Sequence, residues 1–235
     1  YGNVLWQAPN WGNSSYHALN LKVERRFAAG FNLLANYTWA KFLDDVEANS
    51  EAGGAPGNGQ QSYYARALDK SYSGSDLRHR FVASTVYEIP VGIGKRVNLS
   101  SRLADAIVGG WSLGVITEAR AGLPYGVIEN SNRLNAFSSA QRPNLVGDAR
   151  LDSSRPRSEF VRQWFDTSQY VFPGDGRLGN AARTTGFGPG FFGVDVSLLK
   201  DFRFSESRFL QLRGEAFNLA NRPNFGLPNG SRGNA

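Results

Sequence analysis

The chain has 235 residues, among them 16 Phe, 9 Tyr and 5 Trp, and its formal net charge is +6. It contains no cysteine, which excludes disulfide bonds, cysteine-ligated zinc and thiol catalysis. No stretch approaches about 18 consecutive apolar residues, so the sequence predicts no transmembrane helix. The basic residues are spread along the chain without a long run of like charge, which argues against nucleic-acid binding.

Six segments have the alternation of apolar and polar residues that is typical of β-strands. In chain order they span residues 15–27, 31–43, 79–90, 110–122, 191–202 and 208–219. Each is about 10–13 residues long, which is the length that a tilted strand needs to cross a bilayer.

The connections between these strands differ strongly in length. Residues 28–30 join the first two strands and residues 203–207 join the last two, whereas the second and fourth strands are followed by about 35 and almost 70 residues with no predicted structure. An intermediate segment, 91–109, joins the third and fourth strands and is predicted to form a helical turn or two near a membrane surface. Short turns on one side and long loops on the other are typical of outer-membrane barrels, in which the short turns are periplasmic.

Alternation also assigns the two faces of each strand. In the first strand Leu19, Leu21 and Val23 share one side, while Lys22 and Glu24 share the other. A mid-bilayer Arg or Lys on the lipid side costs about 2–4 kcal/mol, so we expect the charged side to face the lumen. The candidate lumen-facing residues are Glu24, Glu118, Arg120, Asp195, Arg213 and Glu215, and we expect cross-strand charge pairs among them.

Aromatic residues near the strand ends are predicted to form girdles at the two membrane surfaces. They are Tyr16, Tyr37, Trp39, Tyr87, Trp111 and Phe191. Taken together, these patterns predict an all-β fold: an antiparallel transmembrane β-barrel segment of about six strands, which is incomplete because the smallest barrels have about eight.

The loops hold the remaining candidate sites. The longest loop mixes cations with aromatic residues, and these could either contact an anionic or peptide ligand or pack over the barrel rim. They are Arg155, Arg157, Arg162, Trp164, Phe165 and Tyr170. Asp44, Asp45 and Glu47 are weak candidates for a calcium site, with a solvated loop as the favoured alternative. The sequence predicts no firm metal site, no cofactor and no catalytic residues.

Several segments resemble TonB-dependent receptors of the Oar-like type. They are DLRHRFVASTVYEIPVG, GGWSLGVITEARAGLPY, SLLKDF and EAFNLANRPNFG, and the resemblance extends over nearly the whole chain. It implies a barrel of about 22 strands that is closed by an N-terminal plug, and this chain, 1–235, would be the C-terminal portion of that barrel without the plug and the N-terminal domains. The partners implied are outer-membrane lipid, the TonB complex through the plug, and an unknown large ligand.

The function implied is transport of a large substrate across the outer membrane of a Gram-negative-type bacterium, with energy supplied through TonB and without enzymatic activity. Two other interpretations stay open at the level of sequence. One is a passive porin- or adhesin-type barrel with the same wall but no plug. The other is a soluble secreted β-sandwich that binds carbohydrate, because the strands of a sandwich also alternate.

Overall fold

The computed structural model describes residues 12–45, 61–62, 64–130, 133, 141–205 and 208–232, with the backbone alone at 203–205. Six long strands dominate it: β1 (Ser14–Ala28), β2 (Phe31–Asp44), β4 (His79–Glu88), β7 (Trp111–Arg120), β13 (Phe191–Ser205) and β14 (Arg208–Ala216). These are the six strands that the sequence predicts, with ends that agree to within a few residues.

The other elements are short. The short strands are β3 (Ser71–Tyr72), β5 (Val91–Gly92), β6 (Val97–Asn98), β8 (Pro124–Tyr125), β9 (Ile128–Glu129), β10 (Asn144–Leu145), β11 (Tyr170–Val171), β12 (Gly186–Phe187) and β15 (Ser231–Arg232). The helices are α1 (Arg102–Val108) and α2 (Arg157–Arg162), together with the single-turn helices η1 (Arg66–Asp69) and η2 (Thr167–Gln169). No helix in the part of the chain that the structure describes is long and apolar enough to span a membrane.

The long strands form one antiparallel sheet in the order β1-β2-β4-β7-β13-β14, and β3 adds to the end of β2. We call this sheet the wall. Consecutive long strands are neighbours throughout, as in an up-and-down meander. Within the described residues β1 and β14 each pair with one long strand, so the wall ends in two open edges and does not close into a barrel.

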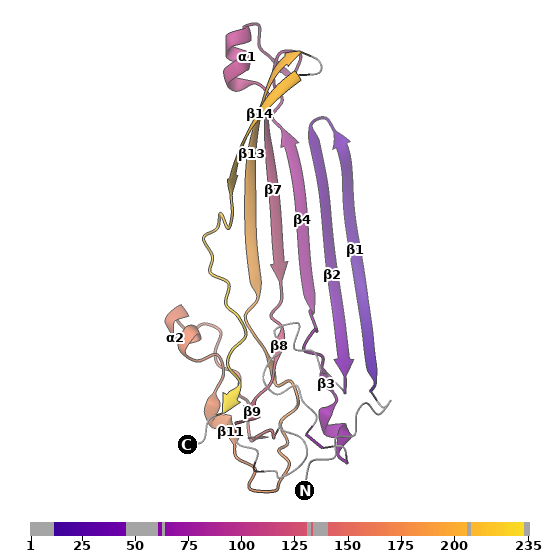
Figure 1. The fold of residues 1–235 in the computed structure, drawn as a ribbon, viewed down its shortest axis with the longest axis vertical. Helices are drawn as coiled ribbons and strands as arrows, with labels where there is room; N and C mark the ends of the chain where they lie inside the picture. The colour runs from indigo at the N-terminus through magenta and orange to yellow at the C-terminus, as the bar shows by residue number, and fades with distance from the viewer. Residues whose placement is uncertain are drawn as a thin grey trace, which may run out of the picture.

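The two ends of the wall differ (Figure 1). The β1–β2 and β13–β14 hairpins and α1 lie at one end, which we call the turn end, whereas β3, β8, β9, β11 and α2 lie at the other, the loop end. The β1–β2 hairpin is tight because Ala29 (φ 53°) and Gly30 (φ 78°) both have positive φ, which is the geometry that a short hairpin turn requires.

The hydrophobic core of the protein lies at the loop end and not under the wall. Tyr125, Val127, Ala149, Phe165 and Tyr170 are buried together, and Leu145, Trp164 and Leu227 pack against them. The described parts of residues 61–78, 121–190 and 225–232 thus fold into an ordered layer, the cap (Figure 1). The sequence-based expectation of structureless long loops is wrong here, because aromatic residues distant in sequence pack on one another.

Candidate functional site

One face of the wall is apolar from strand to strand. The strand register places residues from different strands in rows across the sheet, so a whole row shares one face. One such row runs through Leu21, Tyr37, Phe81, Ala119 and Phe192. The faces predicted from alternation therefore agree with the observed register.

Side chains on this apolar face are exposed on the edge strand β1 and mostly half-buried on the central strands. Leu21 is 53% and Val23 60% exposed, and no second sheet in the described part of the chain covers them. Between Phe31 and Trp39 the face extends for about 27 Å along β2 at about 3.4 Å per residue. A tilt of about 40° reduces this to about 20 Å of depth, which is close to the ~25 Å apolar band of an outer-membrane wall.

Aromatic residues mark the two ends of this face. Phe31 and Tyr87 meet edge to face at 6.3 Å at the turn end, and Tyr37 and Trp39 lie toward the loop end. Two of the predicted girdle residues do not belong to this face. Tyr16 is opposite Phe42, and Phe191 is opposite Arg120, so both lie on the polar face. Side-chain parity, applied strictly, places them there.

The opposite face carries most of the charged residues of the wall, whereas Arg25, Lys41 and Lys200 lie on the apolar face near the ends of their strands. The register places all six candidate lumen-facing residues on it: Glu24, Glu118, Arg120, Asp195, Arg213 and Glu215. These six residues contact different partners, and the predicted cross-strand ion pair is formed by one of them, Glu118.

Glu118 pairs across strands with Arg80, at 3.2 Å. By contrast, Glu24 pairs with Lys22 of its own strand at 2.7 Å, and Glu215 pairs with Arg213 at 2.5 Å. In these two strands, residues two positions apart lie on the same face and close enough to pair without a neighbouring strand.

Arg120 and Asp195 make other contacts. The guanidinium of Arg120 lies 5.0 Å from the ring centre of Phe191, and Asp195 accepts a hydrogen bond from the backbone N–H of Asn218 at 2.8 Å. The polar face is thus lined by charges of both signs that are mostly neutralised locally.

The aromatic residues predicted as ligand candidates belong to the core of the cap. Phe165 stacks on Tyr125 at 5.1 Å and meets Tyr170 edge to face at 5.4 Å. The Trp164 indole N–H donates to the carbonyl of Phe187 at 2.9 Å. Burial raises the pKa of both tyrosine hydroxyls. This arrangement corresponds to rim packing, which the sequence left open as the alternative to ligand contact.

The three arginines predicted with them lie near α2. Arg155 donates to the carbonyls of Asp152 and Gln163, at 3.0 and 3.1 Å, and is held in place. Arg157 lies over the ring of Phe225, with 5.4 Å between the guanidinium carbon and the ring centre. Arg162 is exposed. Arg157 and Arg162 remain the accessible members of the predicted set.

Sequence reasoning missed two buried ion pairs, one within the cap and one that attaches the cap to the wall. Arg142 pairs with Asp69, and Arg183 pairs with Asp44 at the end of β2. Gln61 lies among them and accepts hydrogen bonds from the backbone N–H groups of Arg142 and Gly179, at 2.9 and 3.1 Å. Their partners are separated by 73 and 139 positions, so no local pattern could have indicated them.

Burial is the main influence on the pKa values of the Asp69–Arg142 pair. It raises the pKa of Asp69 against the opposing effect of Arg142, and it lowers the pKa of Arg142. Because a buried charge without its partner is costly, each member depends on the other.

The calcium candidates already have protein partners. Asp44 accepts from Arg183, while Asp45 accepts from the Asn13 N–H at 2.7 Å and pairs with Arg66 at 3.1 Å. Burial would raise the pKa of Asp45, but these partners hold it below its usual value. Glu47 lies outside the described residues. Within the described ranges no group of three or more acidic or histidine side chains is arranged to hold a metal ion.

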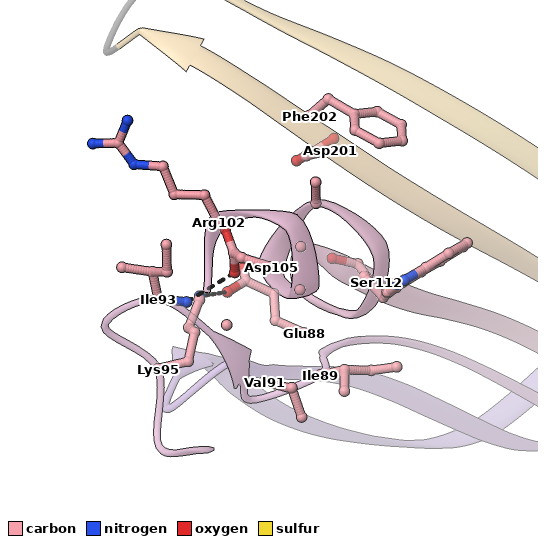
Figure 2. Close-up of a pocket in the computed structure, with 15 residues that line it drawn as sticks. Glu88, Ile89, Val91, Ile93, Lys95, Arg102, Asp105, Ser112, Asp201 and Phe202 are labelled. Carbon is pink, nitrogen blue, oxygen red and sulfur yellow. Dashed lines mark hydrogen bonds and ion pairs between the residues drawn. The ribbon is translucent and has the colours of Figure 1, made fainter. Parts of the chain in front are cut away.

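A cavity of about 680 Å³ opens at the turn end, between α1, the β5 segment and the ends of β4, β7 and β13 (Figure 2). The residues that line this cavity include Glu88, Lys95, Asp105 and Asp201, so its lining carries charges of both signs. Figure 2 shows the hydrogen bond that closes one side, from the N–H of Ile93 to the carboxylate of Asp105 at 2.8 Å.

Comparison with known families agrees with this geometry. A family model described as an outer membrane beta barrel domain matches residues 1–235, the whole chain. No curated protein and no solved structure matches the chain at a significant level. With its single meandering sheet, exposed apolar face and charged opposite face, the chain belongs to the outer membrane beta barrel domain family and resides in the outer membrane of Gram-negative bacteria.

Proposed function

We propose that this chain is the C-terminal barrel portion of a TonB-dependent receptor, which moves a large substrate across the outer membrane. The observation that carries the proposal is the cap. The loops fold around a core of their own, one buried ion pair links them to each other and a second links them to Asp44 of β2, so the loop end presents a preformed surface. A preformed surface suits a receptor that captures a ligand, because little ordering entropy is lost on binding.

The positions of the motifs support the same proposal. The segments that resemble Oar-like receptors coincide with β4, β7, β13 and the chain that leaves β14. The two open edges of the wall leave room for further strands on both sides, as a barrel of about 22 strands requires.

In this proposal each region has a separate role. The apolar face contacts lipid, the charged face contacts a plug or lumen water, and the accessible arginines Arg157 and Arg162 of the cap contact the ligand. Energy reaches the substrate from TonB through the plug, so the chain acts as wall and receptor surface and not as an enzyme.

The test is bilayer conductance of the protein with its complete coding region. We expect that region to encode a plug, and the protein to conduct little until denaturant unfolds the plug inside the barrel. A stable open conductance without denaturant, and a coding region with only further strands, would overturn the proposal in favour of a passive porin or adhesin. The soluble sandwich is set aside by the fold, because the long strands form one sheet and not two packed sheets.

A further inference from the structure

The short helix α1 at the turn end exposes apolar side chains that nothing in the described structure covers. Leu103 is 80% and Ile107 is 72% exposed, and a spacing of four residues places them on one side of the helix. Ile93, which follows β5, and Val97, which begins β6, are also more than half exposed. An apolar cluster of this kind at a defined place usually marks an interaction surface.

Hydrogen bonds from the wall show on which side of the sheet α1 lies. The Trp111 indole N–H donates to the carbonyl of Ile107 at 3.0 Å. The Lys200 ammonium donates to the carbonyl of Asp105 at 3.3 Å and also to that of Gly109. Trp111 and Lys200 are register partners and belong to the apolar face, together with Leu212. The last turn of α1 therefore lies against the apolar, lipid-facing side of the wall.

These contacts also resolve a conflict in the wall itself. Lys200 is a cation on the lipid-facing side, where an exposed charge is costly. It is 3% exposed, its ammonium is bonded to helix carbonyls, and it lies 5.0 Å from the ring centre of Phe202. A cation bonded to the C-terminal carbonyls of a helix is favourably placed in the helix dipole. The wall thus fixes α1 at one height, next to the end of the apolar band.

We propose that α1 is an interfacial anchor that rests in the periplasmic phospholipid leaflet, with Leu103 and Ile107 inserted among the upper acyl carbons. The turn end is the periplasmic end because barrels of this class have their short turns there. The occupant is phospholipid because the surface continues the lipid-facing band, and because two exposed cations, Arg96 beside Val97 and Arg102 beside Leu103, are available to anionic headgroups. A helix of seven residues is too short to be stable alone, so its position depends on Trp111 and Lys200.

The absence of cysteine makes a direct test possible, because a single introduced cysteine can be labelled specifically. The protein would be folded into phosphatidylcholine–phosphatidylglycerol vesicles as Leu103→Cys or Ile107→Cys and labelled with an environment-sensitive fluorophore. We expect blue-shifted emission that is quenched severalfold by lipids with a spin label high on the acyl chain. Val115→Cys on the apolar face is the positive control, and Ser112→Cys on the polar face is the negative control.

Two outcomes would overturn the proposal. Water-like emission at both helix positions, with Val115→Cys quenched normally, would mean that α1 lies in the periplasm. Blue-shifted emission that lipid quenchers do not reach would mean that protein covers the helix. A second experiment without any label separates these outcomes from a labelling defect. We expect Ile107→Asp to bind or fold into the vesicles severalfold less than Ile107→Leu. Equal yields of the two variants would also count against the anchor.

Discussion

The wall and the cap are built from the same chain by opposite rules. In the wall, large apolar side chains are exposed or half-buried on one face and most charges lie on the other, and Ala40, Gly114 and Lys200 are its few buried members outside the end of β2. In the cap, aromatic residues are buried together and so are the charged pairs. The cap is organised as a water-soluble protein, whereas the wall is organised for a solvent that is itself apolar.

This difference shows where each region obtains its stability. Backbone hydrogen bonds hold the wall together, and its apolar residues are stable when lipid surrounds them. The cap gains from side-chain burial in water and from long-range ion pairs. We therefore expect substitutions in the cap to change the stability of the cap alone. Substitutions on the apolar face of the wall should change its stability through their contact with lipid.

The largest expected effect is at a buried charge in the cap. Arg142→Met leaves Asp69 buried without its cation, which should destabilise the cap by about 3–5 kcal/mol. Hydrogen exchange should rise in cap peptides and stay unchanged in the wall. The matched control, Arg142→Met with Asp69→Leu, removes both charges and should recover most of the loss. If Arg142→Met raised hydrogen exchange equally in wall and cap peptides, the two regions would not be stabilised independently.

The next effect compares adjacent residues on opposite faces of β7. Val115→Arg puts a cation on the apolar face near mid-membrane, and it should cost about 2–4 kcal/mol of folding free energy in a bilayer. Ile116→Arg puts the same cation on the polar face, opposite Asp195, and should change the stability by less than about 0.5 kcal/mol. Denaturant titration in vesicles measures both. Similar losses at the two positions would contradict the assignment of the faces.

The smallest effect concerns the junction between wall and cap. Arg78 packs against two rings that also meet each other, with its guanidinium carbon 4.4 Å from the centre of Tyr72 and 3.7 Å from that of Phe187. Arg78→Lys keeps the charge but loses the planar stacking, so it should cost about 1 kcal/mol. Thermal unfolding followed by near-UV circular dichroism would measure it, with Arg150→Lys on the exposed cap surface as the control. A loss no larger than that of the control would rule out a stabilising role for the stack.

Much of the wall could be predicted from the sequence, because alternation is local information. Leu19, Leu21 and Val23 reveal their common face within one strand, and the register then repeats that face across the sheet. The errors at Tyr16 and Phe191 came from assigning aromatic residues by nearness to a strand end instead of by parity.

The cap could not be predicted in the same way. Its contacts join Asp69 to Arg142 and Asp44 to Arg183, and nothing periodic connects such distant positions. Phe165 and Tyr170 have the composition of a recognition surface, and the sequence alone does not show whether such residues face solvent or one another. Burial in the cap is a property of the assembled loops and not of any one of them.

The direction of the strands has a consequence for how the number of strands in such barrels can evolve. β1 begins at the loop end, and the chain beyond β14 returns to that end, where β15 pairs with β9. The six strands therefore form a unit with an even number of crossings, and it starts and finishes on the same side of the membrane. Gain or loss of such a unit, or of one hairpin from it, would alter the circumference of a barrel without inverting any remaining strand. Duplication in pairs is thus a route by which barrels of different size can arise from one ancestral hairpin.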